Sequence, residues 1–181
     1  VLSFEENSAN TKMAVSFAAQ TGASVEAEIG SMGKRETGSG QADEKEDPDK
    51  IYTDPGQAKI FVEATGIDAL ACSFGTTHGV YLSKPKLDFS VVENVRSLTG
   101  IPVVMHGGSG VSEEDFRKAI RAGVRKINYY TYMALAGGDG VKAQIKEEAF
   151  DGPVMYHDVV SRGVREMKEN CKEAMRIFAM R

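Results

Sequence analysis

The stretch LTGIPVVMHGG, residues 98–108, passes from the end of an amphipathic segment through a glycine into a short apolar run. The same order recurs in QTGASVEAEIG (20–30), ATGIDALACSFG (64–75) and RAGVRKINYYT (121–131). A glycine after a helical segment is a common helix C-terminal cap, because glycine adopts a positive φ without strain. Short runs of Val, Ile, Leu and Ala are typical of strands buried on both faces. The repeated unit is therefore helix, glycine, strand, loop.

This alternation predicts an α/β fold in which the strands form a parallel sheet and the helices lie outside it. An open doubly wound sheet and a (β/α)8 barrel both fit, and periodicity alone does not separate them. The glycines expected to cap the helices are Gly22, Gly66, Gly100 and Gly123.

The composition is that of an ordinary globular protein and predicts one domain spanning residues 1–181. Of the 181 residues, 41% are hydrophobic and 27% are charged, which suffices for one sizeable core. The net charge of -4 argues against nucleic-acid binding, and no apolar run approaches the length of a membrane-spanning helix. Cys72 and Cys171 do not form a disulfide framework, and the chain shows no secretory leader. We therefore expect a cytoplasmic protein that acts on a small molecule.

Two segments lie outside the repeat. Residues 31–54 are rich in glycine and charge and predict a long mobile loop, which is either a cover for an active site or simply disordered. Residues 155–181 have apolar side chains three and four positions apart, so we expect a C-terminal helix with one apolar stripe. His157 lies at the start of that helix, where capping or packing explains it better than metal binding.

The strand expected within SVEAEIG, residues 24–30, carries two carboxylates on one face. Alternation with a period of two separates Glu26 and Glu28 from the apolar residues between them. Carboxylates that face inward require cations or hydrogen-bond donors beside them. An exposed edge strand is the alternative explanation.

Polar residues collect at the ends of the expected strands, where parallel α/β architectures place their active sites. They are Glu26, Glu28, His78, Gly79, His106, Gly107, Gly108, Ser109, Asn128 and Thr131. One histidine in such a place is more often structural, but two on neighbouring strands favour a metal. Imidazoles converging from adjacent strands suit zinc, whose catalytic sites use three protein ligands and keep one open position. The glycines suit a phosphate bound by backbone N–H groups, with a tight loop as the alternative.

The ordered set SVEAEIG, YTDP, FGTTHGVY, PKLDF, IPVVMHGGSG and KIN resembles the class II ketose-bisphosphate aldolases, the metal-dependent fructose- and tagatose-bisphosphate enzymes. The resemblance runs from about residue 1 to about residue 135. It implies a (β/α)8 TIM barrel and a lyase that cleaves a ketose 1,6-bisphosphate. The products would be dihydroxyacetone phosphate and glyceraldehyde 3-phosphate, formed through a zinc-stabilised enediolate. A homodimer or tetramer is the implied assembly.

The resemblance also implies roles for individual residues. His78 and His106 would bind the catalytic zinc, and Glu28 would be an alternate ligand or bind a second divalent ion. Glu36 would move protons at the reacting carbon from the mobile loop. The residues implied in substrate binding are Gly79, Gly107, Ser109 and Thr131 for a phosphate, with Na+ or K+ nearby, and Asn128 for the ketol portion.

The sequence departs from the family pattern in several places, among them Leu82, which stands where some relatives carry a lysine. A further histidine ligand and an adjacent catalytic aspartate belong to an upstream segment that these 181 residues do not contain. Because a (β/α)8 barrel typically takes about 250 residues, the resemblance implies the C-terminal part of a barrel, about strands 5 to 8 with their helices. We expect no activity from this part alone. Tyr130 and Tyr132 stand where many relatives have acidic residues, which leaves fructose versus tagatose bisphosphate open.

Two other functions remain compatible with the sequence. One is a non-catalytic barrel that kept the glycine-rich phosphate site, and the other is a metal-dependent hydrolase built on the same histidines. Substitution of His78 or His106 by alanine separates an enzyme from the non-catalytic barrel. A hydrolase would release inorganic phosphate instead of a triose phosphate.

Overall fold

The computed structural model of the chain describes residues 2–30, 52–79, 85–147 and 152–181, and the statements below refer to these residues. The described helices are α1 (Phe4–Ala19), α2 (Pro55–Thr65), α3 (Phe89–Thr99), α4 (Glu113–Ala122), α5 (Thr131–Glu147) and α6 (Tyr156–Phe178). The described strands are β1 (Glu26–Ile29), β2 (Ala69–Cys72), β3 (Val103–Met105) and β4 (Val124–Ile127). The chain divides into two compact units, Val1–Asn128 and Tyr129–Arg181.

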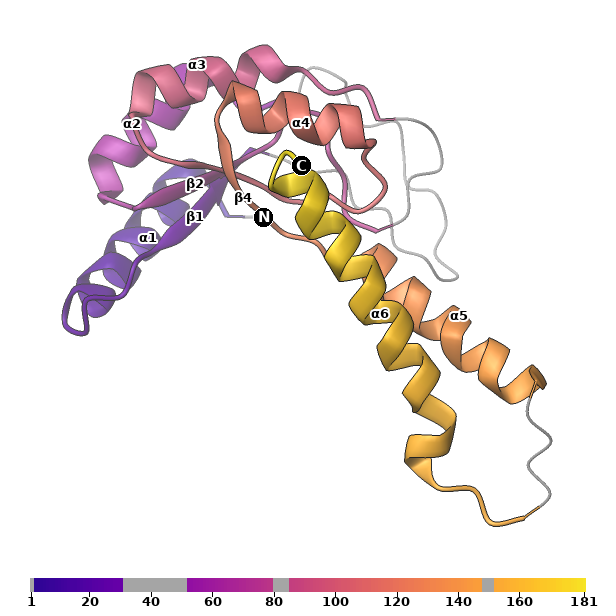
Figure 1. Cartoon of the computed structure of the whole chain (residues 1–181). Coiled ribbons are helices and arrows are strands. Elements are labelled where there is room, and N and C mark those ends of the chain that lie inside the picture. Colours follow the sequence, from indigo (N-terminus) through magenta and orange to yellow (C-terminus); the bar gives the residue numbers. More distant parts are fainter. Residues whose placement is uncertain (1, 31–51, 80–84, 148–151) are drawn as a thin grey trace. The chain divides into compact units, whose positions relative to one another are not determined.

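In the first unit the described strands form one parallel sheet in the order β1-β2-β3-β4. Each strand lies beside the one before it in the sequence, and α2, α3 and α4 make the successive crossovers (Figure 1). A doubly wound sheet reverses its strand order at a switch point, whereas a barrel adds every strand on the same side. The sequential order therefore confirms the barrel type of α/β fold, present here as an arc of the barrel wall.

Helices α1 to α4 follow one another along the outside of this arc, each packed against the next (Figure 1). The largest fully buried side chains of the described residues include Phe61, Leu70, Phe74, Val92, Val95, Val103, Val104, Met105 and Val124. Burial of each such side chain stabilises the fold by about 1.5–3 kcal/mol. The core therefore comes from the short apolar runs and the helical stripes that the sequence predicts.

The helix ends follow the predicted glycines with one exception. Gly66 and Gly100 cap α2 and α3 at φ of 71° and 70°, and Gly123 caps α4. The prediction for Gly22 is wrong by two residues, because Gln20 is the cap of α1. Gly22 still turns the chain at φ 69°, and the N–H of Ala23 donates to the carbonyl of Ala18 at 3.1 Å. The helix thus ends in a tightened turn before the glycine.

The pairing register decides which side chains face the inside of the arc. Glu28, Ala71, Val104 and Lys126 form one row across the sheet. Between β3 and β4 the register shifts, because consecutive residues Val103 and Val104 pair with Val124 and Lys126, and one residue of β4 is left over. Such a bulge moves the following side chains to the opposite face. It therefore aims Lys126, and not its neighbour, at the interior.

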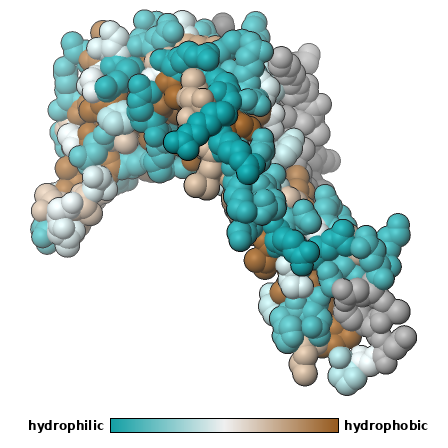
Figure 2. All heavy atoms as spheres, in the orientation of Figure 1, coloured by the Kyte–Doolittle hydropathy of each residue, from teal (hydrophilic) through white to brown (hydrophobic). Residues whose placement is uncertain are grey.

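The second unit is a helical hairpin of α5 and α6 (Figure 1). The helices approach closely at glycines: a Cβ on Gly163 would lie 2.8 Å from the carbonyl oxygen of Gly137. On the face shown in Figure 2, hydrophobic side chains are exposed among hydrophilic ones along this hairpin. Exposed apolar residues of the unit include Leu135, Ile145, Val164 and Met175. None of the helices within the described residues is both long enough and apolar enough to cross a membrane.

Candidate active site

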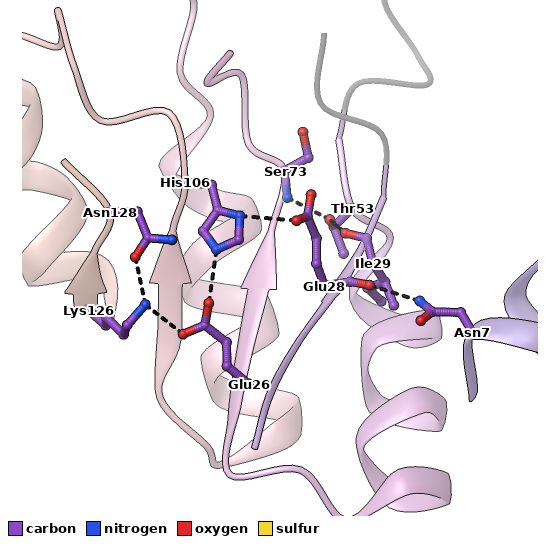
Figure 3. Close-up of polar contacts among 9 residues, drawn as sticks. All are labelled: Asn7, Glu26, Glu28, Ile29, Thr53, Ser73, His106, Lys126 and Asn128. Atoms are coloured by element: carbon purple, nitrogen blue, oxygen red, sulfur yellow. Dashed lines mark hydrogen bonds and ion pairs between the residues drawn. The ribbon is translucent and has the colours of Figure 1, made fainter. Parts of the chain in front are cut away.

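His106 lies between two carboxylates at the inner face of the arc (Figure 3). Its Nε2 is 2.9 Å from Oε1 of Glu26, and its Nδ1 is 3.0 Å from Oε2 of Glu28. The contacts reach from β1 to the end of β3, so the carboxylates must cross β2. Ala69 and Ala71, the β2 partners of Glu26 and Glu28, have no side chain beyond Cβ and leave the carboxylates room. Glu26 and Glu28 thus share one face of β1 and meet a partner there, while β1 is also an edge strand of the described sheet, the alternative that the sequence left open.

Lys126 extends this cluster on the side of β4 (Figure 3). Its Nζ lies 2.8 Å from Oε2 of Glu26 and donates to Oδ1 of Asn128 at 2.6 Å. Glu26 is thus held at both oxygens, by His106 at one and by Lys126 at the other. The side chains of Asn128, Lys126, Glu26, His106 and Glu28 form one continuous polar chain.

The charges of this cluster favour a cation at its centre. The hydrogen bond with Glu28 is the largest influence on His106 and raises the pKa of its imidazole, with burial opposing and Glu26 adding to the effect. Burial alone would raise the pKa of Glu26, but the hydrogen bonds and charges of Lys126 and His106 outweigh it and lower that pKa. Glu26 is therefore an ionised carboxylate, and the imidazole sits in a field that attracts positive charge.

His78 approaches the cluster from the loop after β2. Its ring centre is 6.0 Å from that of His106, at an interplanar angle of 34°. Two imidazoles on one tetrahedral zinc have ring centres roughly 5 Å apart, given Zn–N bonds of about 2 Å. The two rings and Glu28 supply N and O donors of the kind zinc prefers, so these residues fit the implied ion. Within the described residues, no three such side chains are already gathered around one point.

One of the predicted phosphate-binding glycines, Gly107, lies directly against neighbouring backbone. Gly107 has φ 65°, and a Cβ there would lie 2.3 Å from the carbonyl oxygen of Thr77. The loop after His106 therefore rests directly on the residue before His78, which ties the two histidine segments together. Gly79 has φ 89°, and Ser109 is 4% exposed. Backbone this close leaves room only for glycine at residue 107.

Two polar side chains outside the predicted set hold the strand ends (Figure 3). Asn7 of α1 donates through Nδ2 to the carbonyl of Glu28 at 2.9 Å. The buried Thr53 hydroxyl donates to the carbonyl of Ile29 at 2.9 Å and accepts from the N–H of Ser73 at 2.8 Å. These bonds connect the end of β1, at Glu28 and Ile29, to α1 and to the residue after β2. Nothing in their sequence spacing signals these roles.

The structure does not test the roles of three other histidine, glutamate and threonine residues considered in the sequence. Glu36 and most of the segment 31–54 fall outside the described residues. Thr131 is the first residue of α5, in the second unit. The side chain of His157, near the start of α6, is 80% exposed and lies 3.3 Å from Asp158. The roles of Glu36 and Thr131 thus remain predictions from the resemblance.

The fold and the cluster define an α/β barrel protein with polar groups at the carboxyl ends of its strands. The chain matches the family model of fructose-bisphosphate aldolase class-II over residues 1–181. It belongs to this family, as the ordered motifs around His78 and His106 predict. Class II aldolases are lyases.

Solved structures support the same assignment. The chain is similar to the YdjI aldolase from Escherichia coli K12, with a TM-score of 0.78 and 37% identity over 98% of this chain and 57% of that one. A putative fructose-1,6-biphosphate aldolase from Coccidioides immitis matches with a TM-score of 0.77 and 26% identity, over 98% and 60% of the two chains. Fructose-bisphosphate aldolase from Campylobacter jejuni matches with a TM-score of 0.75 and 25% identity, over 98% and 57%. The chain thus spans less than two thirds of these proteins.

Proposed function

We propose that this chain carries part of the active site of a zinc-dependent aldolase that reversibly cleaves a ketose 1,6-bisphosphate. The products are dihydroxyacetone phosphate and glyceraldehyde 3-phosphate. The observation that carries the proposal is that His106, at a strand end of a family member, lies 3.0 Å from Glu28 and has its ring centre 6.0 Å from that of His78. Phosphorylated sugars are the substrates named for two of the similar structures.

In this proposal His78 and His106 hold the zinc ion, and Glu28 is an alternate ligand or binds a second divalent ion. A bound zinc ion supplies a Lewis acid that stabilises negative charge on substrate oxygens. A further histidine ligand and a catalytic aspartate come from upstream of the barrel segment seen here. Since this chain matches 57–60% of the similar structures, we expect it to correspond to the C-terminal part of such a barrel.

The remaining residues bind and orient the substrate. Backbone N–H groups of Gly79 and Gly107, with the Ser109 and Thr131 hydroxyls, bind one phosphate. Asn128 donates its amide to the ketol portion and fixes the orientation of the bond to be cleaved. Glu36 moves a proton at the reacting carbon when its segment closes over the substrate and excludes water.

The test uses the protein at its full natural length. Fructose 1,6-bisphosphate and tagatose 1,6-bisphosphate are supplied separately, and both triose phosphate and inorganic phosphate are measured. We expect triose phosphate from one of the sugars, loss of activity with chelator, and recovery with added zinc. Release of inorganic phosphate without triose phosphate would identify a hydrolase and overturn the proposal.

His78→Ala and His106→Ala serve as the decisive variants, with His157→Ala as the matched control because its side chain is exposed near the start of α6. Loss of turnover by at least a hundredfold in the first two, with the control unchanged, supports the assigned metal ligands. Binding of a phosphorylated ligand by a wild-type protein that shows no turnover would instead indicate a non-catalytic barrel.

A further inference from the structure

Lys126 has none of the roles assigned above, yet it links Asn128 to Glu26 in the polar cluster. One ammonium group reaches Oε2 of Glu26 at 2.8 Å and Oδ1 of Asn128 at 2.6 Å. It lies on the interior face only because β4 has an extra residue opposite the step from Val103 to Val104. The β-bulge in the pairing of β3 with β4 thus brings this lysine to the site.

The contact with Asn128 settles the orientation of its amide. A lysine ammonium has only donors, so the group of Asn128 that faces it must be the carbonyl oxygen. The NH2 group of Asn128 is then free of this contact and available to donate to an oxygen of the substrate.

The contact with Glu26 settles the tautomer of His106 by the same logic. Glu26 is ionised and acts only as an acceptor, so Nε2 of His106 at 2.9 Å must carry the proton. Nδ1 lies 3.0 Å from Oε2 of Glu28 and donates to it when no metal is bound, so Nδ1 is the nitrogen that would give up its proton to a metal held between the two. Carboxylates that hold the remote N–H of a ligating histidine fix its tautomer and orientation in metal sites.

We propose that Lys126 is a positioning residue that orients two functional side chains at once, the amide of Asn128 directly and the imidazole of His106 through Glu26. The inference rests on the proposed function, because it assigns Nδ1 of His106 to the metal and the Asn128 amide to the substrate. The 53% exposure of the Lys126 side chain is consistent with this role. Partly exposed ion pairs contribute little to stability, so removal of the lysine should alter the site more than the fold.

The experiment compares Lys126→Met and Lys126→Arg in the protein at full natural length. Chelator competition measures zinc affinity, and long-range 1H–15N spectra of histidine-labelled, zinc-loaded protein report the tautomer of His106. In K126M we expect roughly tenfold weaker zinc binding and loss of the single Nε2–H form. K126R keeps the charge and the donors. We therefore expect its zinc affinity to stay within about threefold of wild type, and His106 to remain in the Nε2–H form.

Lys118→Met is the matched control, because Lys118 makes a comparable 2.7 Å ion pair with Glu114 on the outer helix α4. We expect wild-type zinc affinity and spectra from it. If K126M keeps both the wild-type zinc affinity and the Nε2–H form of His106, the positioning role is wrong. Failure of the proposed function would look different: the wild-type protein would give no triose phosphate, whatever the state of the His106 ring.

Discussion

Substitution of Gly107 by alanine should disturb the site through one backbone contact. A Cβ at this position would lie 2.3 Å from the carbonyl oxygen of Thr77 and 2.7 Å from its carbonyl carbon. The backbone of Thr77 must therefore retreat by about 0.7 Å to restore even a 3.0 Å separation. Alanine at φ 65° adds a conformational cost of about 1–2 kcal/mol. We expect a total loss of about 3 kcal/mol or more in the free energy of unfolding.

Gly100→Ala is the matched control, because Gly100 has φ 70° and nothing lies within 4 Å of its added Cβ. It carries the conformational cost alone, so urea unfolding should show a loss of about 1–2 kcal/mol. The shift at Thr77 also moves His78, the next residue, and metal sites tolerate displacements of only about 0.5 Å. Zinc affinity should therefore fall by at least tenfold in Gly107→Ala and remain unchanged in Gly100→Ala. Equal effects of the two substitutions on both measurements would refute this reasoning.

Three further predictions concern two buried residues of the first unit and a pair of glycines in the helical hairpin. Thr53→Val should lower the free energy of unfolding by about 2–3 kcal/mol, because it leaves a buried backbone N–H and C=O without their hydroxyl partner; Thr53→Ser should restore most of it in urea unfolding. Burial raises the pKa of Cys72 to about 12, so mass spectrometry after iodoacetamide treatment at pH 8 should find it unlabelled in folded protein and labelled in guanidinium. In α5, Gly138→Ala should stabilise the protein by about 0.5–1 kcal/mol, since nothing lies within 4 Å of its Cβ. Gly163→Ala should destabilise the protein, because its Cβ would lie 2.8 Å from the carbonyl oxygen of Gly137. A higher melting temperature for Gly163→Ala than for Gly138→Ala in thermal unfolding would contradict the close packing of α5 and α6.

Much of the fold follows from local signals in the sequence. The glycines at residues 66, 100 and 123 mark helix ends because only glycine takes their positive φ easily. The alternation around Glu26 and Glu28 places both carboxylates on one face, and the structure shows them there with His106. Periodicity left open whether the sheet is doubly wound or part of a barrel, because strand order depends on contacts between distant segments. The sequential order of the described strands decided it.

The sequence predicted only those site residues whose side chains have a specific chemical function. His78, His106 and Asn128 stand out because imidazole and amide groups at strand ends are chemically specific. Lys126 does not stand out, because regular alternation would place it on the same face as the buried Val124. The bulge that moves it inward arises from the pairing of β3 with β4, and the residues of β4 alone do not reveal it. Its role emerges only from the assembled sheet.

The most direct test of the account is the zinc content of the protein at full natural length, purified without chelator and compared with His78→Ala and His106→Ala. If these residues hold the metal together, wild type should retain about one tightly bound zinc per chain, and each variant should lose most of it while circular dichroism stays native. Equal zinc content in wild type and both variants would contradict the central claim that these two histidines form the metal site.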